Sequence, residues 1–389
     1  MQNKFSLVLL STAVLSLAAC GQTNYEDHLG DYVHTMSFHD NFNILQLTDI
    51  HWNYNTSTLA SRGYLDKLFH EVKEHLVTTQ GVDAKIDLVE LTGDQFMLAN
   101  AYHVDSFVKY FDQKAEEYGF KYAVIWGNHD HHGIYNPNWL SDMFKNAKHA
   151  IYSDENDNLY GRSNFVINLM SGEETKWQIA NLDSGASFSE TAVSPFRDYD
   201  YIRPEQTKWW KAEHDRVGKD VPTIAYYHIP QEENQKAWDD IHDKGATYRN
   251  KFFKLESFAD NGNEKYASDF LDVGAENGLK AAFMGHAHNN DWTVECEFED
   301  AEHNVNKVVV GLGVKTGPEL YYAHINVEDE DPAMKEGLAS VGITENFDLI
   351  GASLVTIKDG AKEGNFDLEH LYLNEDSSEK GYKNWWVKW

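Results

Sequence analysis

Short apolar runs alternate with longer amphipathic segments in the first third of the chain. Residues 42–48, 86–91 and 121–126 predict buried strands, and residues 57–76 and 104–118 predict the helices between them. Strands that alternate with helices favour an α/β sheet with parallel pairing and right-handed crossovers. The apolar residues of the first predicted helix recur on one face: Leu65, Leu68, Phe69, Val72 and Leu76.

Polar side chains follow each of these three strands at the point where the strand ends. Because the carboxyl ends of parallel strands meet at one edge of a sheet, we expect these side chains to lie close together. Asp49 and His51 flank one residue, so in extended backbone both side chains point the same way. The polar residues at the three ends are Asp49 and His51, then Asp94, then Asn128, His129 and Asp130.

The middle of the chain loses this simple alternation. Residues 160–169 and 176–182 predict a pair of strands, and residues 205–217 predict a helix opened by Pro204. A further buried strand at 221–227 ends at His228, and the apolar residues 281–284 precede His286 and His288. These three imidazoles repeat the placement of the earlier polar groups, which favours metal binding over a structural role.

The remaining segments complete the predicted domain. Residues 231–264 form a polar insertion that predicts a loop and a short helix near the site. Strands at 307–312, 353–357 and 366–373 predict a second sheet that completes a sandwich, and the acidic residues 328–331 predict a solvated loop.

The first 40 residues are interpreted as processing and tethering segments. Lys4 precedes an uncharged apolar run that ends in Leu17-Ala18-Ala19-Cys20, which resembles the lipobox of bacterial lipoproteins. Residues 1–19 are then the signal peptide, 20–40 a tether from lipidated Cys20, 41–373 the domain and 374–389 an aromatic tail. The alternatives are an ordinary secretory peptide or a short buried helix. The favoured interpretation predicts an extracytoplasmic protein anchored by lipid to the bacterial cell membrane.

Charge and cysteine content narrow the classes of partner. The net charge of −30 argues against a nucleic-acid polymer as partner, although bound metal ions can still attract a small anionic substrate. Apart from Cys20, only Cys296 carries a thiol, so no internal disulfide is expected. The oligomeric state is left open.

Five motifs in this order resemble the calcineurin-like metallophosphoesterase superfamily: D-I-H at 49–51, G-D-Q at 93–95, G-N-H-D at 127–130, H-I-P at 228–230 and G-H-A-H at 285–288. The N-N-D that follows at 289–291 and the glycine-rich 311–313 are most similar to the purple acid phosphatase-related branch. The resemblance implies a four-layer αββα fold of the α/β class, with two mixed β-sheets flanked by helices.

The resemblance also implies a two-metal site. It assigns one ion to Asp49, His51 and His288, the other to Asn128, His228 and His286, and a bridging role to Asp94. A hydroxide shared by the ions would attack phosphorus, and this ligand set suits Mn, Zn or Fe. His129 would act as general acid or as a donor to the phosphoryl oxygens, with Asp130 or Asp49 orienting its ring. The alternative for His129 is a neutral hydrogen-bonding role, and His131 and His132 are expected to be solvated loop residues.

One position departs from the named branch. Purple acid phosphatases carry a tyrosine ligand three residues after the bridging aspartate, where this chain has Met97. Because a thioether is a poor ligand for trivalent iron, we expect a colourless or weakly coloured site in which His51 supplies the missing ligand.

The residues around the motifs allow two interpretations. Five aromatic residues near the motifs could stack on a substrate, although core packing is favoured, and Arg62 could reach a phosphate. The tryptophans at 385, 386 and 389 are expected to dock on the domain. The five aromatic residues are Trp52, Phe96, Tyr227, Trp238 and Trp292.

The function favoured by these observations is a metal-dependent phosphomonoesterase acting on a small phosphate ester. The alternatives are a phosphodiesterase or nucleotidase activity of the same site, or a catalytically inactive lipoprotein that serves as a surface-binding module. The complete set of predicted ligands disfavours the inactive alternative.

Overall fold

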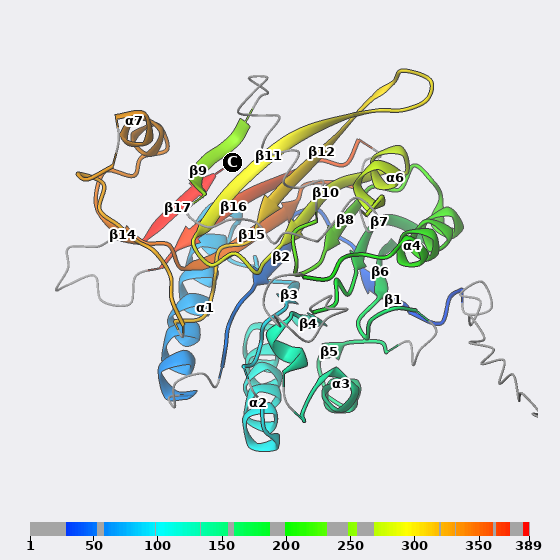
Figure 1. Ribbon diagram of the computed structural model, residues 1–389, viewed down its shortest axis with the longest axis horizontal. Helices are drawn as coiled ribbons and strands as arrows, with labels where there is room; N and C mark the ends of the chain where they lie inside the picture. Colours follow the sequence, from blue (N-terminus) through cyan, green and yellow to red (C-terminus); the bar gives the residue numbers. More distant parts are fainter. Residues whose placement is uncertain are drawn as a thin grey trace, which may run out of the picture.

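Two mixed β-sheets pack against each other in the computed structural model, with helices on their outer sides (Figure 1). This architecture confirms the predicted α/β fold with two mixed sheets flanked by helices. The structure describes residues 29–52, 58–97, 99–132, 134–154, 159–186, 199–231, 248–254, 268–318, 320–330, 332–360, 363–373 and 384–388.

The first sheet has seven strands, and its centre holds the three strands that begin the predicted alternation. β2, β3, β4 and β5 run parallel, whereas β15, β16 and β17 are joined in antiparallel fashion. In spatial order the strands are β17 (Trp385–Lys388), β16 (Phe366–Tyr372), β15 (Gly351–Ile357), β2 (Phe42–Leu47), β3 (Leu88–Thr92), β4 (Lys121–Ile125) and β5 (Ala150–Ile151).

The second sheet has eight strands. Its central strands β7, β8, β10 and β12 run parallel to one another, and antiparallel pairs follow on both sides of them. In spatial order the strands are β1 (Val33–Ser37), β6 (Phe165–Ser171), β7 (Glu174–Asn181), β8 (Thr223–Tyr226), β10 (Leu279–Met284), β12 (Val305–Leu312), β11 (Asn290–Glu299) and β9 (Tyr248–Lys254).

Helices cover the two sheets on opposite sides of the molecule (Figure 1). α1 (Thr58–Gln80) and α2 (Ala101–Tyr118) lie beside the seven-stranded sheet, followed by α3 (Pro137–Lys145). α4 (Pro204–Val217) and α6 (Phe270–Glu276) lie beside the eight-stranded sheet. The apolar face predicted for the first helix is fully buried. The aromatic residues Trp52, Phe96, Tyr227 and Trp292 are also buried, which confirms that they belong to the core. Trp238 lies outside the described residues.

The fold begins before the predicted boundary at residue 41. β1 pairs in parallel with β6, from Val33 opposite Val166 to Ser37 opposite Met170, and Tyr32 is buried. The prediction of a free tether up to residue 40 is therefore wrong for the described residues 29–40. The sequence V-H-T-M-S does not show the apolar pattern of a buried strand. β1 lies at the edge of its sheet and pairs with β6, a segment distant in the sequence.

Three late segments also differ from the predictions. The strands predicted together as a second sheet divide between the two sheets, because β12 joins the eight-stranded sheet whereas β15 and β16 extend the seven-stranded one. Within the predicted insertion at 231–264, the described residues 248–254 form β9 rather than a loop or helix. At the carboxyl end, β17 pairs with β16, so the predicted docking of this segment on the domain is confirmed for Trp385 and Trp386.

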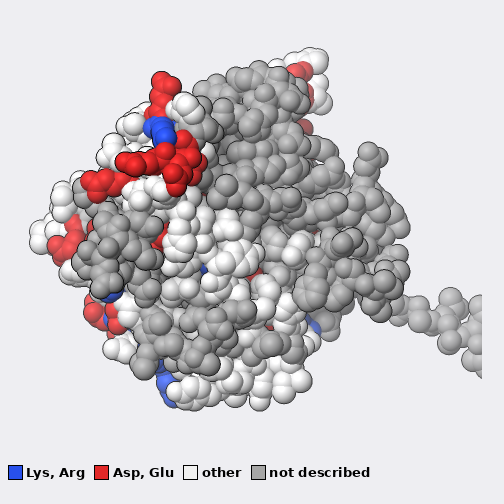
Figure 2. Space-filling view, turned by 60° about the vertical axis from the view of Figure 1, so that its left-hand side comes forward, with Lys and Arg blue, Asp and Glu red and all other residues white. Residues whose placement is uncertain are grey.

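Acidic side chains gather at the upper left of the face in Figure 2, where α7 (Pro332–Ser340) and the turn before it lie. Glu328 and Asp329 in that turn are exposed, as predicted for the acidic run. Among the described residues, no helix is both long enough and apolar enough to cross a membrane.

Candidate metal centre

The carboxyl ends of five strands meet at one place between the two sheets. β2, β3 and β4 lie side by side in the seven-stranded sheet, and β8 and β10 are neighbours in the other. Backbone hydrogen bonds then join the loops that follow, since the amide of Asp49 donates to the carbonyl of Gly93 and the amide of Gly285 donates to the carbonyl of His228. All seven predicted ligands lie on these loops.

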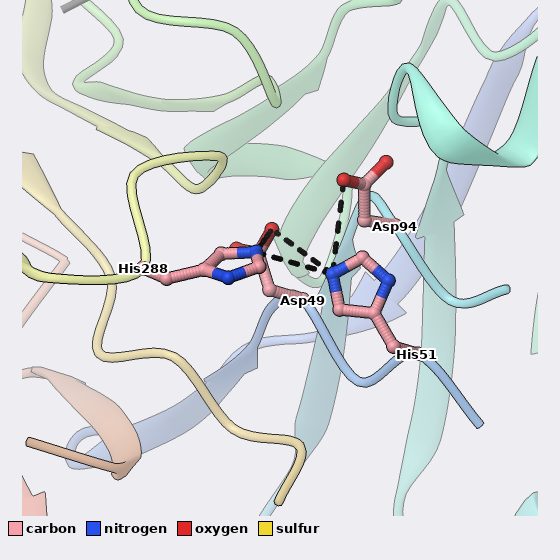
Figure 3. Close-up of side chains that lie close together, drawn as sticks. All are labelled: Asp49, His51, Asp94 and His288. Carbon is pink, nitrogen blue, oxygen red and sulfur yellow. Dashed lines mark hydrogen bonds and ion pairs between the residues drawn. The ribbon is translucent and has the colours of Figure 1, made fainter. Parts of the chain in front are cut away.

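Four side chains form the first cluster, and Figure 3 shows them pointing toward one another. His51 Nε2 lies 3.1 Å from His288 Nε2 and 3.9 Å from Asp49 Oδ1 and Asp94 Oδ2. His288 Nε2 lies 3.2 Å from Asp49 Oδ1. Each of the four residues offers a ligand atom within 4.8 Å of the others, and all four are buried.

The second cluster shares Asp94 with the first. Asp94, His228 and His286 each offer a ligand atom within the same 4.8 Å limit, and His228 Nε2 is 3.3 Å from Asp94 Oδ2. The side-chain oxygen of Asn128 lies 2.8 Å from His286 Nδ1 and 3.2 Å from His228 Nε2. The structure therefore groups the seven residues in the same two sets that the resemblance implied, with Asp94 common to both.

In Asp49 and in Asp94, one carboxylate oxygen accepts hydrogen bonds from the surrounding loop and the other faces the imidazole rings of the site. Asp49 Oδ2 accepts hydrogen bonds from the Thr48 hydroxyl at 2.8 Å and the His286 amide at 3.0 Å, and Asp94 Oδ1 accepts one from the His129 amide at 2.7 Å. Asp49 Oδ1 and Asp94 Oδ2 are buried, and among the described residues neither accepts a hydrogen bond of good geometry, although an imidazole nitrogen lies close to each. Because an unpaired buried carboxylate oxygen is costly, these two atoms and the imidazole nitrogens around them fit a set of metal ligands.

The backbone at the ligands is strained. Asp49, His51, Asp94 and His286 have φ values of 54°, 47°, 53° and 75°, in the left-handed region that residues with a side chain seldom adopt. Such strain is found where the surrounding structure holds a functional group in place.

Glycines let the loops approach one another. A Cβ atom at Gly127 would lie 2.3 Å from Asp94 Oδ1, and one at Gly285 would lie 1.9 Å from the Thr48 hydroxyl oxygen. A side chain at either position would collide with the atoms that orient Asp94 and Asp49. Glycine is therefore required at both positions by the close approach of the neighbouring atoms.

The protonation of the imidazoles differs across the site. Burial lowers the pKa of His228, but the charges of Asp94 and Asp49 and the hydrogen bonds to Asp94 and to the Thr92 carbonyl together raise it to about 9. Burial lowers the pKa of His286 to about 3, and the charge of His228 adds to this effect. Burial opposes ionisation of Asp94, whereas His228 and His129 hold its pKa well below the usual range. Asp94 is therefore charged and His286 neutral, the states in which they can bind a metal ion, whereas His228 must release its proton to do so.

His129 lies at the open side of the two clusters. Its side chain is 21% exposed, and its Nε2 lies 3.9 Å from Asp94 Oδ2. Its ring meets the ring of His51 edge-on at 5.2 Å, and its Nδ1 is 3.3 Å from Nδ1 of His132.

Asp130, one of the two aspartates expected to orient the ring of His129, has other partners in the structure. The carboxylate of Asp130 instead accepts hydrogen bonds from the backbone amides of Gly127 at 2.9 Å, Phe96 at 2.8 Å and Gln95 at 3.3 Å. The short 3-10 turn η2 (His129–His131) turns this side chain back under the loop. Asp130 therefore ties the third motif to the second, and it does not orient the ring.

Other predictions near the motifs need correction. His131 and His132 are half-buried rather than solvated, because η2 folds them back against the site. Arg62 packs over the rings of Trp52 and Tyr110, with its guanidinium carbon 5.7 and 5.9 Å from their centroids, and so is engaged away from the metal ligands. Met97, in the position of the missing tyrosine, is half-buried.

Three neighbours of the site had no signal in the sequence. Tyr199 lies against His286 and Tyr321 lies against His288, with ring centroids 4.3 and 4.8 Å apart. Lys315 donates to the backbone carbonyl of Asp49 at 2.8 Å. All three are remote in sequence from the motifs, and only the folded chain brings them there.

Comparison with known proteins gives relatives of low identity. The chain is 25% identical over 283 residues to probable inactive purple acid phosphatase 28 of Arabidopsis thaliana, covering 64% of this chain and 66% of that protein. It is 25% identical over 278 residues to phosphatase DCR2 of Saccharomyces cerevisiae, covering 68% of this chain and 46% of that protein. The chain thus spans less than two thirds of the length of either relative.

Two solved structures are also similar. NAD nucleotidase (NadN) of Haemophilus influenzae has a TM-score of 0.38 and 14% identity, covering 87% of this chain and 55% of that one. TT1561 of Thermus thermophilus has a TM-score of 0.36 and 11% identity, covering 70% of this chain and 88% of that one. Finally, the family model named calcineurin-like phosphoesterase matches residues 42–290, which is more than half of the 389 residues and includes every predicted metal ligand. The chain therefore belongs to the calcineurin-like phosphoesterase family.

Proposed function

We infer that this chain is a metal-dependent phosphoester hydrolase with a two-metal site, and that it acts on phosphate monoesters in preference to diesters. The observation that carries this inference is the convergence of all seven predicted ligands, with one oxygen of Asp49 and one of Asp94 left without a hydrogen bond of good geometry and facing imidazole nitrogens. Membership of the phosphoesterase family supports the type of reaction.

The two sets of ligands divide the work of holding two ions. Asp49, His51 and His288 would hold one, Asn128, His228 and His286 the other, and Asp94 both. When bound, two such ions offset the charge of the phosphoryl oxygens and make water nucleophilic at neutral pH. Imidazole mixed with carboxylate and amide oxygen suits Mn, Zn or Fe better than Ca or Mg.

His129 is the proposed proton donor to the leaving oxygen. Its ring is the part of the third motif that reaches the opening, and its amide holds Asp94 in place at 2.7 Å. A histidine that is partly exposed can exchange its proton with solvent between turnovers. Asp130 supports this arrangement indirectly, because it fixes the loop from which His129 projects.

The test is hydrolysis of p-nitrophenyl phosphate and of its bis-ester with Mn, Zn or Fe(II) added, together with elemental analysis of the purified protein. We expect bound metal and faster turnover of the monoester. Asp94→Ala should abolish both metal occupancy and turnover. Asp215→Ala on the surface of α4, where the side chain is 48% exposed, is the matched control and should change neither. Full activity of Asp94→Ala would contradict the assignment.

The same experiment separates the alternatives. Faster turnover of the bis-ester would indicate a phosphodiesterase. Absence of turnover with every metal, together with absence of bound metal, would indicate an inactive binding module.

The proposed location is the extracytoplasmic side of a bacterial membrane, with a lipid on Cys20. The support is the sequence from Lys4 to Cys20, which lies outside the described residues. Cell fractionation tests the location: the wild-type protein should sediment with membranes, and Cys20→Ser should release it or leave it unprocessed. Recovery of both forms in the cytoplasmic fraction would contradict the proposal.

A further inference from the structure

Two tyrosine rings lie beside the histidines that close the two ligand sets. The ring of Tyr199 meets His286 at 4.3 Å between centroids with 76° between the planes. The ring of Tyr321 meets His288 at 4.8 Å and 45°. His286 and His288 belong to different ligand sets, so one tyrosine flanks each half of the site.

These rings lie toward solvent, whereas most of the ligands are buried. Tyr321 is 56% exposed although it touches His288, which is only 4% exposed, and Tyr199 and His286 are half-buried. A large ring that keeps this much exposed surface next to a buried polar centre is typical of a binding surface.

Three basic side chains, one beside Asp49 and two close in sequence to the first motif or to Tyr199, are already engaged. Lys315 is 2% exposed and donates to the carbonyl of Asp49. Arg203, close in sequence to Tyr199, pairs with Asp200 at 2.8 Å and packs over the ring of Tyr160. Arg62 packs over Trp52. A second anionic group on the substrate would have to compete with the contacts that these three cations already make, whereas an uncharged ring would find aromatic partners.

We propose that Tyr321, together with Tyr199, receives the alcohol part of the ester, and that this part is a planar, uncharged aromatic group. This proposal rests on the proposed phosphoesterase function. Tyr321 is the stronger determinant, because its ring has the larger exposed surface. A flat group stacked on it would be held beside the metal ligands without making contact with them.

The test compares two esters that differ in the planarity of the ring and not in the type of leaving oxygen. Benzyl phosphate and cyclohexylmethyl phosphate both release a primary alcohol, so their chemical reactivity is similar. We expect wild-type KM to be about three- to tenfold lower for the benzyl ester, as for an aromatic pair. Tyr321→Leu should remove this preference, and Tyr321→Phe should retain it.

A binding measurement separates recognition from turnover. Benzylphosphonate, which cannot be hydrolysed at the carbon–phosphorus bond, should bind the metal-loaded wild type more tightly than cyclohexylmethylphosphonate in calorimetry. The difference should disappear in Tyr321→Leu at unchanged metal content.

The possible failures are distinguishable. Equal efficiency for the two esters, or a benzyl preference that survives in Tyr321→Leu, would overturn the aromatic pocket and leave the hydrolase intact. Absence of turnover of both esters and of p-nitrophenyl phosphate would refute the hydrolase and the pocket together.

Discussion

A buried glutamate between the two sheets allows a quantitative test of the fold. Glu90 of β3 is 0% exposed, pairs in register with Gln46 of β2, and interacts with Asn181 of β7 and Tyr226 of β8. Neither of its carboxyl oxygens has a hydrogen-bond donor of good geometry among the described residues. Burial therefore raises the pKa of Glu90 well above its usual value, and the contact with Asn181 only partly opposes this.

The raised pKa makes stability depend on pH in a definite direction. Below the unfolded pKa of about 4.5 both states keep the proton, so Glu90 adds no pH dependence. Above it the unfolded chain releases the proton while folded Glu90 retains it. The free energy of unfolding then falls by about 1.4 kcal/mol for each pH unit until the folded pKa is reached.

Glu90→Gln keeps the shape of the neutral acid and has no proton to release. We expect the variant to gain stability over the wild type as pH rises from 5.5 to 8, with the gap widening by about 1 kcal/mol per pH unit. The free energy of unfolding is measured in urea with a chelator present, so that bound metal does not contribute to the difference between the two proteins. Glu336→Gln, at an exposed position on α7, is the matched control and should follow the wild type. Parallel curves for Glu90→Gln and the wild type would show that Glu90 ionises in the folded protein and would refute the reasoning.

Two further predictions concern residues that support the ligands. Asp130→Asn should lower the free energy of unfolding in urea by about 1–3 kcal/mol and weaken metal binding in calorimetry. The reason is that the amide nitrogen of Asn would face backbone N–H groups that now donate hydrogen bonds to the Asp130 carboxylate. Unchanged values would contradict the role of Asp130 in joining the two loops. Asp291→Asn should cost a similar amount, because Asp291 of β11 joins His370 at 3.0 Å and Tyr372 of β16 across the two sheets, and equal urea midpoints for variant and wild type would argue against this cross-sheet link.

The central sheet and the convergence of the candidate ligands could be predicted because local signals determine them. Apolar strands followed at once by Asp49, Asp94 and Asn128 need only the rule that parallel strands share a carboxyl edge, and β2, β3 and β4 are indeed neighbours. The polar residues directly follow each apolar run in the sequence, so the sequence itself indicates at which end of the strand they lie.

The remaining features depend on contacts between distant segments. The direction of the Asp130 side chain depends on the η2 turn and on amides of the second motif, which no spacing rule reveals. β12 and β15 have similar apolar sequences but belong to different sheets. Their sequences therefore do not indicate which strands they pair with. Tyr321 reaches His288 through a loop whose sequence carries no motif.

The direction of β1 has a practical consequence for handling the protein. Val33 lies in one row with Val166, Ala180 and Ala225, and the chain continues from that end of β8 to His228. The chain therefore enters β1 at the same edge of the sheet that carries the metal ligands. A purification tag, fluorophore or solid support joined upstream of residue 29 is therefore attached at the edge of the sheet where the candidate ligands lie. Immobilisation through strand β17, which belongs to the other sheet, avoids attachment at β1.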